Sequence, residues 1–195
     1  MGIAGETGNS RRRQDGFSLL EVVIATGIMA SALVTLGQLF GLSVSTNRAA
    51  QALTYTTVLA QQKMEQLRGL EWGLDSLGLP VTDGETDTTA AVETPTGGTG
   101  LSPSPPDTLT RNVPGWVDYV DRFGNMLGGG ANPPAKTVYV RRWSLEPLAH
   151  NVDDAIVIQV LVTPVLNRGR ADAAGSTVRL PGESRLMSVR TRKAQ

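Results

Sequence analysis

The sequence lacks cysteine entirely and contains a single histidine, His150, among its 195 residues. The absence of cysteine excludes disulfide bonds, thiol catalysis, iron–sulfur clusters and the commonest zinc sites. One histidine leaves any histidine-based metal site or catalytic triad with a single candidate member. Asp153 and Asp154 follow His150 closely, but no nucleophile stands in a recognisable motif. We therefore expect no enzymatic activity, no cofactor and no metal.

Ionisable residues are nearly absent between residues 17 and 42, where Glu21 is the only one. This apolar run is longer than the roughly 20 helical residues that the hydrocarbon core of a bilayer requires. Arginines occupy positions 11–13, just before the run, and positive charge beside the first apolar helix keeps that side in the cytoplasm. The pattern predicts a helix over residues 17–44 that spans the membrane once, with the chain beyond it outside the cytoplasm.

Gly16, Phe17 and Glu21 belong to a short motif, Gly-Phe-Ser-Leu-Leu-Glu, at the start of this run. With the basic leader before it, the motif resembles the processing site of type IV pilins and of type II secretion pseudopilins. The resemblance implies that a prepilin peptidase cleaves between Gly16 and Phe17 and removes a leader of residues 1–16. It also implies methylation of the new amino group on Phe17, and a filament in which Glu21 neutralises the amino terminus of a neighbouring subunit.

The carboxylate of Glu21 has a physical use in such an assembly. A charge inside an apolar membrane helix is costly unless an opposite charge pairs with it. Two buried opposite charges nearly offset their desolvation when they pair, whereas one left alone is strongly destabilising. Glu21 would thus set the register between neighbouring helices. The alternative is a glutamate at the membrane edge whose carboxylate reaches the headgroups.

The helical pattern continues over residues 45–72, beyond the apolar run. Apolar and small residues recur there at helical spacing and share one face: Ala49, Leu53, Thr56, Ala60, Met64 and Leu67. We expect one helix from Phe17 to about Leu70, whose second half carries a globular domain on this face. Residues 59–68 also resemble the corresponding helix segment of minor pilins of the PilV-like group.

Residues 73–112 are rich in threonine, glycine and proline and poor in large apolar side chains. Seven acidic residues and no lysine or arginine lie between positions 71 and 110, namely Glu71, Asp75, Asp83, Glu85, Asp87, Glu93 and Asp107. Such a composition cannot form a core of its own, so we expect a flexible surface loop that serves as a solvated spacer. An adhesive or glycosylated patch is the alternative.

Residues 113–195 are expected to form the sheet of the globular domain. Strand-forming residues are enriched at 137–145 and 155–162, which predicts an antiparallel hairpin. Further strands are expected at 113–121, 177–180 and 183–191, with a turn at 123–125. The predicted fold class is α+β, a long N-terminal helix packed on a small antiparallel sheet, as the pilin resemblance implies. The order of the strands is similar to the C-terminal sheet of PilV-like minor pilins.

Two binding sites are weaker candidates. Eight basic residues could attract the phosphates of a nucleic acid: Arg141, Arg142, Arg168, Arg170, Arg185, Arg190, Arg192 and Lys193. Charges that alternate along strands usually face solvent, so an ordinary amphipathic sheet is the competing explanation. Asp118, Asp121 and Asn125 offer oxygen ligands for calcium, but their spacing matches no EF-hand loop.

The leading interpretation is a minor pilin, a structural subunit that enters a type IV pilus and helps to initiate or cap its assembly. Its expected partners are the membrane, the prepilin peptidase and other pilins in a hetero-oligomeric filament. Its expected location is the inner (cytoplasmic) membrane and then the assembled pilus. A pseudopilin of a type II secretion system is one alternative. A pilin at the filament tip that binds DNA or another ligand, for uptake or adhesion, is another.

Overall fold

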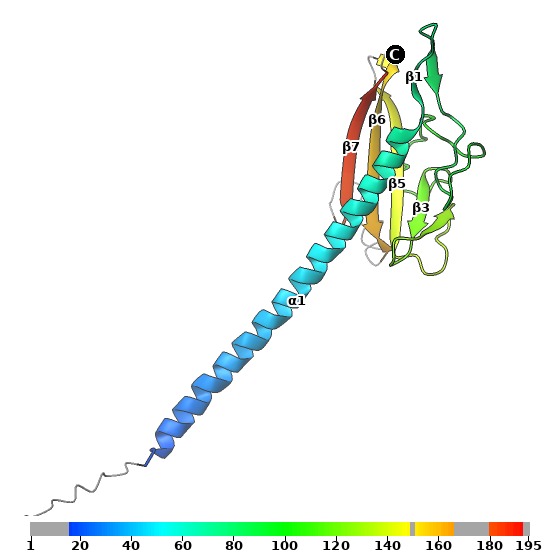
Figure 1. Ribbon diagram of the computed structural model, residues 1–195. Coiled ribbons are helices and arrows are strands. Elements are labelled where there is room, and N and C mark those ends of the chain that lie inside the picture. The colour runs from blue at the N-terminus through cyan, green and yellow to red at the C-terminus, as the bar shows by residue number, and fades with distance from the viewer. Residues whose placement is uncertain (1–15, 149–150, 166–179, 193–195) are drawn as a thin grey trace, which may run out of the picture. The chain divides into compact units, whose positions relative to one another are not determined.

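The computed structural model describes residues 16–148, 151–165 and 180–192 (Figure 1). Residues 1–15 of the leader, His150 and the predicted strand at 177–180, except for Leu180, lie outside these ranges. Helix α1 spans Leu19–Gly69, which confirms the expected helix to within two residues at each end. The chain divides within α1 into two units, residues 1–46 and 47–195, and each is described by itself.

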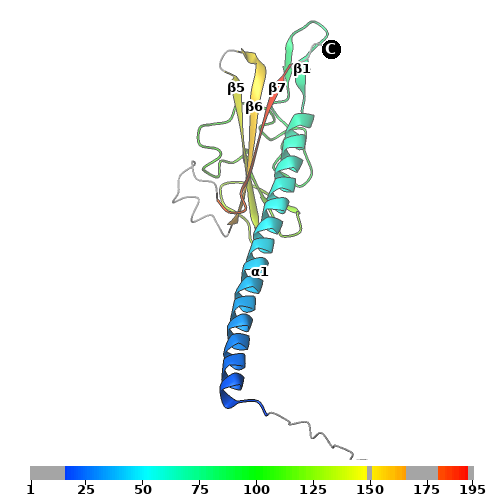
Figure 2. The same ribbon diagram turned by 90° about the vertical axis from the view of Figure 1, so that its left-hand side faces the viewer.

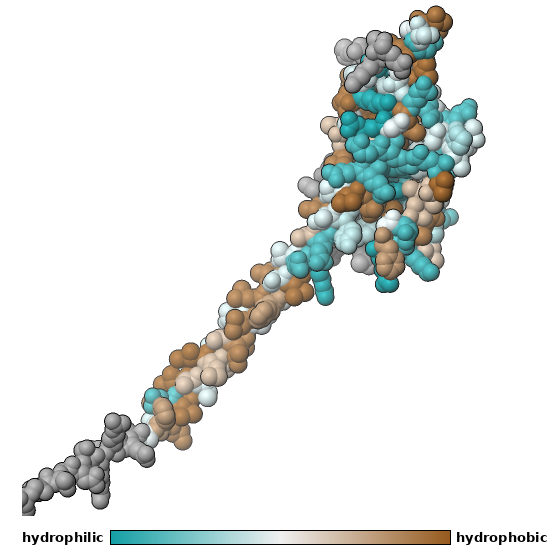
Figure 3. All heavy atoms as spheres, viewed as in Figure 1, coloured by the Kyte–Doolittle hydropathy of each residue, from teal (hydrophilic) through white to brown (hydrophobic). Residues whose placement is uncertain are grey.

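The first unit contains the N-terminal part of α1. Its large apolar side chains are exposed, as Leu20, Ile24 and Ile28 illustrate, and Figure 3 shows apolar side chains along the helix on the face in view. Hydroxyl groups donate to backbone carbonyls one turn earlier, as Thr26 does to Val22 at 2.9 Å, so they present little free polar surface. The helix is long and apolar enough to cross a membrane.

The second unit combines the rest of α1 with two antiparallel sheets (Figures 1 and 2). The small sheet pairs β1 (Trp72–Leu74) with β2 (Pro80–Thr82). The five-stranded sheet has the order β4-β3-β5-β6-β7. Its strands are β3 (Val117–Val120), β4 (Met126–Gly129), β5 (Tyr139–Leu148), β6 (Asn151–Pro164) and β7 (Ser184–Thr191). The α+β class is confirmed.

The main core lies between α1 and one face of the five-stranded sheet. Along β6 the side chains alternate, so that Ile156, Ile158 and Val160 are buried in this core whereas Val157 and Gln159 are half-buried on the opposite face. The helix contributes residues one and two turns apart: Leu59, Ala60, Met64 and Leu67. A smaller cluster on the other face of the sheet contains Val117, Tyr119 and Val140.

The strands differ from the predicted ones in several places: β1 and β2 were not expected, and β3 is shorter than the predicted strand at 113–121. The strand β4 was not expected, because its two glycines are poor strand formers and are typical of a linker. Its antiparallel pairing with β3 stabilises it as a strand despite this low propensity. The hairpin connection is shorter than the gap between the predicted strands at 137–145 and 155–162, since β5 extends to Leu148 and β6 begins at Asn151. The predicted terminal strand at 183–191 is confirmed as β7.

The segment 73–112 contains more structure than its composition indicates. Leu101 is only 1% exposed and belongs to the main core. Aspartate side chains close the local turns, as when Asp83 Oδ1 accepts from the amides of Glu85 and Thr86 at 3.1 and 3.0 Å. The segment therefore covers part of the sheet, and its flexibility stays a prediction.

Candidate functional site

The predicted cleavage site lies just before α1. Gly16 and Phe17 precede the first helical residue, Leu19, and the side chain of Phe17 is 83% exposed. The first hydrogen bond of the helix runs from the amide of Val22 to the carbonyl of Ser18, at 3.2 Å. The bond between Gly16 and Phe17 thus lies in exposed, non-helical backbone, which is the kind of segment that proteases cut.

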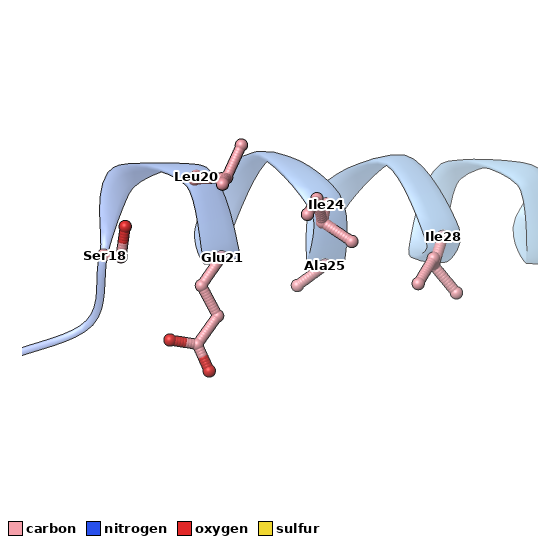
Figure 4. Close-up of a pocket in the computed structure, with 6 residues that line it drawn as sticks. All are labelled: Ser18, Leu20, Glu21, Ile24, Ala25 and Ile28. Carbon is pink, nitrogen blue, oxygen red and sulfur yellow. The ribbon is translucent and has the colours of Figure 1, made fainter.

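Glu21 lies in the first turn of α1 and points away from the helix axis (Figure 4). Ala25 and Ile28 project from the same side, as residues four and seven positions on must. Because Ala25 is small, a shallow apolar groove remains beside the carboxylate, lined by Ser18, Leu20, Glu21, Ile24, Ala25 and Ile28. Among the described residues, no basic side chain pairs with Glu21.

Two influences act on the charge of Glu21 within the first unit. A carboxylate in the first turn is favoured by the helix dipole, by about 0.3–1 kcal/mol at an exposed site. Apolar side chains surround it along the groove, and an unpaired charge becomes costly once such a surface is removed from water. The position therefore suits a carboxylate that is tolerated in the free chain and requires a cation when another helix covers the groove.

A second charged cluster lies in the core of the second unit, where the sequence pattern did not place one. Asp118 of β3 accepts hydrogen bonds from Arg141 of β5 at 2.6 and 2.9 Å. Its Oδ2 also lies 2.9 Å from the ammonium of Lys63 on α1, and both of these side chains are fully buried. Two cations and one carboxylate thus join the helix to adjacent strands.

The ammonium of Lys63 has further partners that complete its coordination. It donates to the carbonyl of Thr88 at 2.5 Å and to Gln66 Oε1 at 2.9 Å. It also lies 3.9 Å from the centre of the Trp143 ring, where a cation–π attraction stabilises it. The cluster therefore fixes the segment 73–112, through Thr88, to both the helix and the sheet. The detectable signal in the sequence was the position of Lys63, which is three residues after Ala60 on the buried face.

Burial lowers the pKa of Lys63 from 10.5 to about 8, since the ammonium loses its hydration. The carboxylate of Asp118 and, more weakly, that of Glu93 oppose this shift, while the charge of Arg141 adds to it. Mainly through burial, and secondarily through the charge of Arg141, the folded chain holds the proton of Lys63 less tightly than the unfolded chain does.

This shift predicts that stability rises between about pH 8 and pH 10.5. Over that range the unfolded chain retains a proton on Lys63 that the folded chain has released, so the free energy of unfolding increases with pH. The pKa difference corresponds to at most about 3 kcal/mol. Denaturant unfolding of the full-length protein in detergent at pH 7.5 and 9.5 measures the change in the free energy of unfolding. Lys63→Met is the control, because it has no titrating group at this position. Identical pH dependence of the two proteins would contradict the prediction.

The predicted basic patch is wrong for two of its members. Arg141 and Arg142 are 2% and 5% exposed, because Arg141 binds Asp118 and Arg142 donates to Asn112 Oδ1 at 3.0 and 2.8 Å. Side chains held in this way cannot reach a nucleic-acid backbone. Arg141 and Arg142 are adjacent in β5 and point to opposite faces of the sheet, and both side chains are covered.

The other members of the patch that the structure describes, Arg185, Arg190 and Arg192, lie on β7 or directly after it. Arg192 donates to the carbonyls of Gly73 and Val81 and stacks on Trp72, which ties the end of β7 to the small sheet. Arg185 is exposed and Arg190 is half-buried. The last three members, Arg168, Arg170 and Lys193, lie outside the described residues.

The two aspartates considered for calcium have other partners. Asp118 is occupied by two cations, and Asp121 accepts from the amides of Phe123 and Asn125 in the tight turn after β3. Within the described part of the chain, no group of three metal-binding side chains is present. These aspartates are accounted for by the core and by the turn.

Comparisons of the chain with protein families, with curated proteins and with solved structures find no match.

Proposed function

We propose that this chain is a minor pilin, a membrane-anchored structural subunit that enters a type IV filament after prepilin peptidase cleavage between Gly16 and Phe17. The observation that carries the proposal is the combination at the N-terminus of α1. A peptide bond in exposed, non-helical backbone is followed by an apolar helix whose first turn contains a carboxylate, that of Glu21, with no basic partner among the described residues. The resemblance of residues 16–21 to prepilin processing sites points in the same direction.

The proposed chemistry needs only a charge pair. Cleavage would create an α-amino group on Phe17, four residues before Glu21, in each copy. When helices leave the lipid and pack together, the carboxylate of one subunit can pair with the amino terminus of a neighbour, so that neither charge is buried alone. The shallow groove beside Glu21 offers the apolar contact surface for that neighbour.

The partners and location follow from this proposal. The chain would lie in the inner membrane until assembly, with the second unit outside the cytoplasm, and would then join other pilins. A type II secretion pseudopilin would use the same residues for the same chemistry, and is the alternative within this class. A DNA-binding tip pilin is less well supported, because Arg141 and Arg142 are buried.

The test is the N-terminus of the mature protein. Mass spectrometry of the protein extracted from membranes is expected to find a chain that begins with N-methylated Phe17. Replacing the glycine, in Gly16→Val, is expected to leave the leader attached, since a branched side chain would occupy the cleavage position. Ser18→Ala is the matched control and should be processed normally. Recovery of the wild-type chain with its arginine leader intact would refute the proposal.

A further inference from the structure

One end of the five-stranded sheet lies beside the first helical residues of the second unit. A Cβ added to Gly182 would be 3.4 Å from the Cβ of Ala52 on α1 and 3.5 Å from the Cγ of Pro164, the last residue of β6. Pro164 pairs in turn with Tyr139, the first residue of β5. The helix therefore enters the unit at the end of the sheet where β5 begins and β6 ends.

The turn after β3 lies at this same end. The carbonyl of Val120, the last residue of β3, accepts from the amide of Val138 at 2.9 Å, just before β5 begins. Arg122 and Phe123 follow in the turn, and Lys136 lies just before the Val138 contact. The side chains of Arg122, Phe123 and Lys136 are exposed. Two cations and one aromatic ring thus extend from the loops at this end of the sheet.

The helix adds a third cation there, because Arg48 is exposed one turn before Ala52. Among the described residues, no acidic side chain forms an ion pair with any of these three cations. Two carboxylates lie nearby, but those of Asp121 and Glu183 already accept hydrogen bonds from backbone amides. This end of the unit therefore has an excess of positive charge. We name its exposed side chains the basic end: Arg48, Arg122, Phe123 and Lys136.

The opposite end of the sheet has exposed carboxylates. Glu146 lies near the end of β5 and Asp154 near the start of β6, and both side chains are exposed. Glu71 is also exposed and directly follows the last turns of α1. The charges of the second unit are thus separated along the strands, with the basic end at the start of its helix.

The basic end also adjoins the apolar run in the chain. Arg48 follows Leu42, the last residue of that run, within about two helical turns. When the run lies in the hydrocarbon of a bilayer, the chain itself keeps the basic end next to the headgroups. Anionic headgroups attract cations within about 8–10 Å at physiological ionic strength.

An exposed aromatic ring among these cations suits the same environment. The side chain of Phe123 is 73% exposed, and the guanidinium of Arg122 lies 4.5 Å from the centre of its ring. Phenylalanine beside basic residues is typical of surfaces that rest in the headgroup region, where the ring leaves water and the cations meet phosphates. In water alone, neither exposed group gains a partner.

We propose that the basic end binds the anionic phospholipid headgroups of the membrane that the helix spans. Binding holds the second unit against the bilayer before the chain joins a filament. A nucleic acid has the same phosphate chemistry, but only the membrane is kept beside these side chains by the chain itself. The inference rests on the membrane anchoring in the proposed function and goes beyond it, since it needs neither cleavage at Phe17 nor the charge of Glu21.

The absence of cysteine from the chain permits a test with a single fluorescent label. Full-length protein with a label on Ala135→Cys, an exposed position beside Lys136, is reconstituted in vesicles of phosphatidylcholine with or without phosphatidylglycerol. Both vesicles contain the same fraction of a lipid with a quencher on its headgroup. We expect stronger quenching with phosphatidylglycerol, and high salt should remove the difference. A label on Ser76→Cys, in the exposed turn between β1 and β2, should be quenched equally in both.

Charge removal identifies the side chains that make the contact. Arg122→Gln combined with Lys136→Gln is expected to lower the ratio of membrane-bound to free second unit about 25-fold in the anionic vesicles, since each cation near such a surface contributes about fivefold. The matched control, Arg68→Gln with Arg111→Gln, removes two exposed cations outside the basic end. It should retain the quenching that depends on phosphatidylglycerol.

The outcomes separate this contact from the proposed function. Equal quenching in the two kinds of vesicle, or a lipid dependence that the Arg122 and Lys136 variant retains, would overturn the contact, whereas co-flotation of the protein with the vesicles would leave the proposed anchoring intact. A label that responds to added duplex DNA but not to phosphatidylglycerol would also overturn it. Protein that does not float with vesicles would refute both proposals. A lipid-dependent contact in a chain that retains its leader in cells would support the contact and refute the proposed function.

Discussion

Replacing Asp118 with alanine is expected to lower the free energy of unfolding of the second unit by about 3–5 kcal/mol, the usual cost of breaking a buried ion pair. The substitution leaves the ammonium of Lys63 and the guanidinium of Arg141 buried together, without the carboxylate that lies 2.9 and 2.6 Å from them. Denaturant unfolding of the full-length protein in detergent, followed by tryptophan fluorescence, measures the loss. Trp143 lies against Lys63 and reports directly on this region.

The controls separate the buried cluster from ordinary charge pairs. Glu65→Ala removes an exposed ion pair with Arg68 on the same helix and is expected to cost less than about 1 kcal/mol. Lys63→Met should cost less than Asp118→Ala, because it leaves one cation and one anion that still pair with each other. If Lys63→Met and Asp118→Ala lowered the free energy of unfolding equally, the buried cluster would not have an excess of positive charge.

Replacing Glu21 with glutamine is expected to reduce incorporation of the chain into filaments about 100-fold, if the charge pair contributes about 3 kcal/mol to each contact. Glutamine has nearly the same shape, so the groove lined by Leu20 and Ala25 stays intact while the charge is lost. The amino group of the neighbouring Phe17 would then be buried without its counterion. Immunoblots of sheared filaments, compared with membranes of the same cells, measure the incorporated fraction.

Two further variants make the filament experiment specific. Ser18→Ala changes a groove residue without changing charge and is expected to assemble as the wild type does. Glu21→Asp keeps the charge on a shorter side chain and should retain part of the incorporation. If Glu21→Gln entered filaments in wild-type amounts, the carboxylate would stabilise only the N-terminus of the helix and would not form a contact between subunits.

The elements with strong local patterns could be predicted from the sequence. The apolar run and the helical spacing of Ala60, Met64 and Leu67 were sufficient to predict α1. The β-branched residues at 155–162 were sufficient to predict β6. Its Ile156 and Ile158 are buried, as expected for a strand inside a sheet. In each case the residues themselves favour the structure that they adopt, and packing only reinforces the preference.

The buried charges and the covering segment could not be predicted. Lysine, aspartate and arginine usually face solvent, so nothing local distinguishes Lys63, Asp118 and Arg141 from surface residues. Their burial depends on mutual contacts between positions that are far apart in the chain. The burial of Leu101 likewise depends on a segment that folds back over the sheet. The candidate site at Gly16, Phe17 and Glu21 came from the motif, and its function stays a prediction.

The position of β7 at the sheet edge has a consequence for synthesis of the protein. Along the chain, β7 follows every other strand of the sheet, and it covers the open side of β6 over residues 155–162. A ribosome that has just completed β6 has therefore produced a nascent chain with a long apolar strand exposed along one side. Such edges attract other unfinished chains. Products terminated before Ser184 should accordingly aggregate or be degraded, and only translation through β7 should yield a soluble sheet.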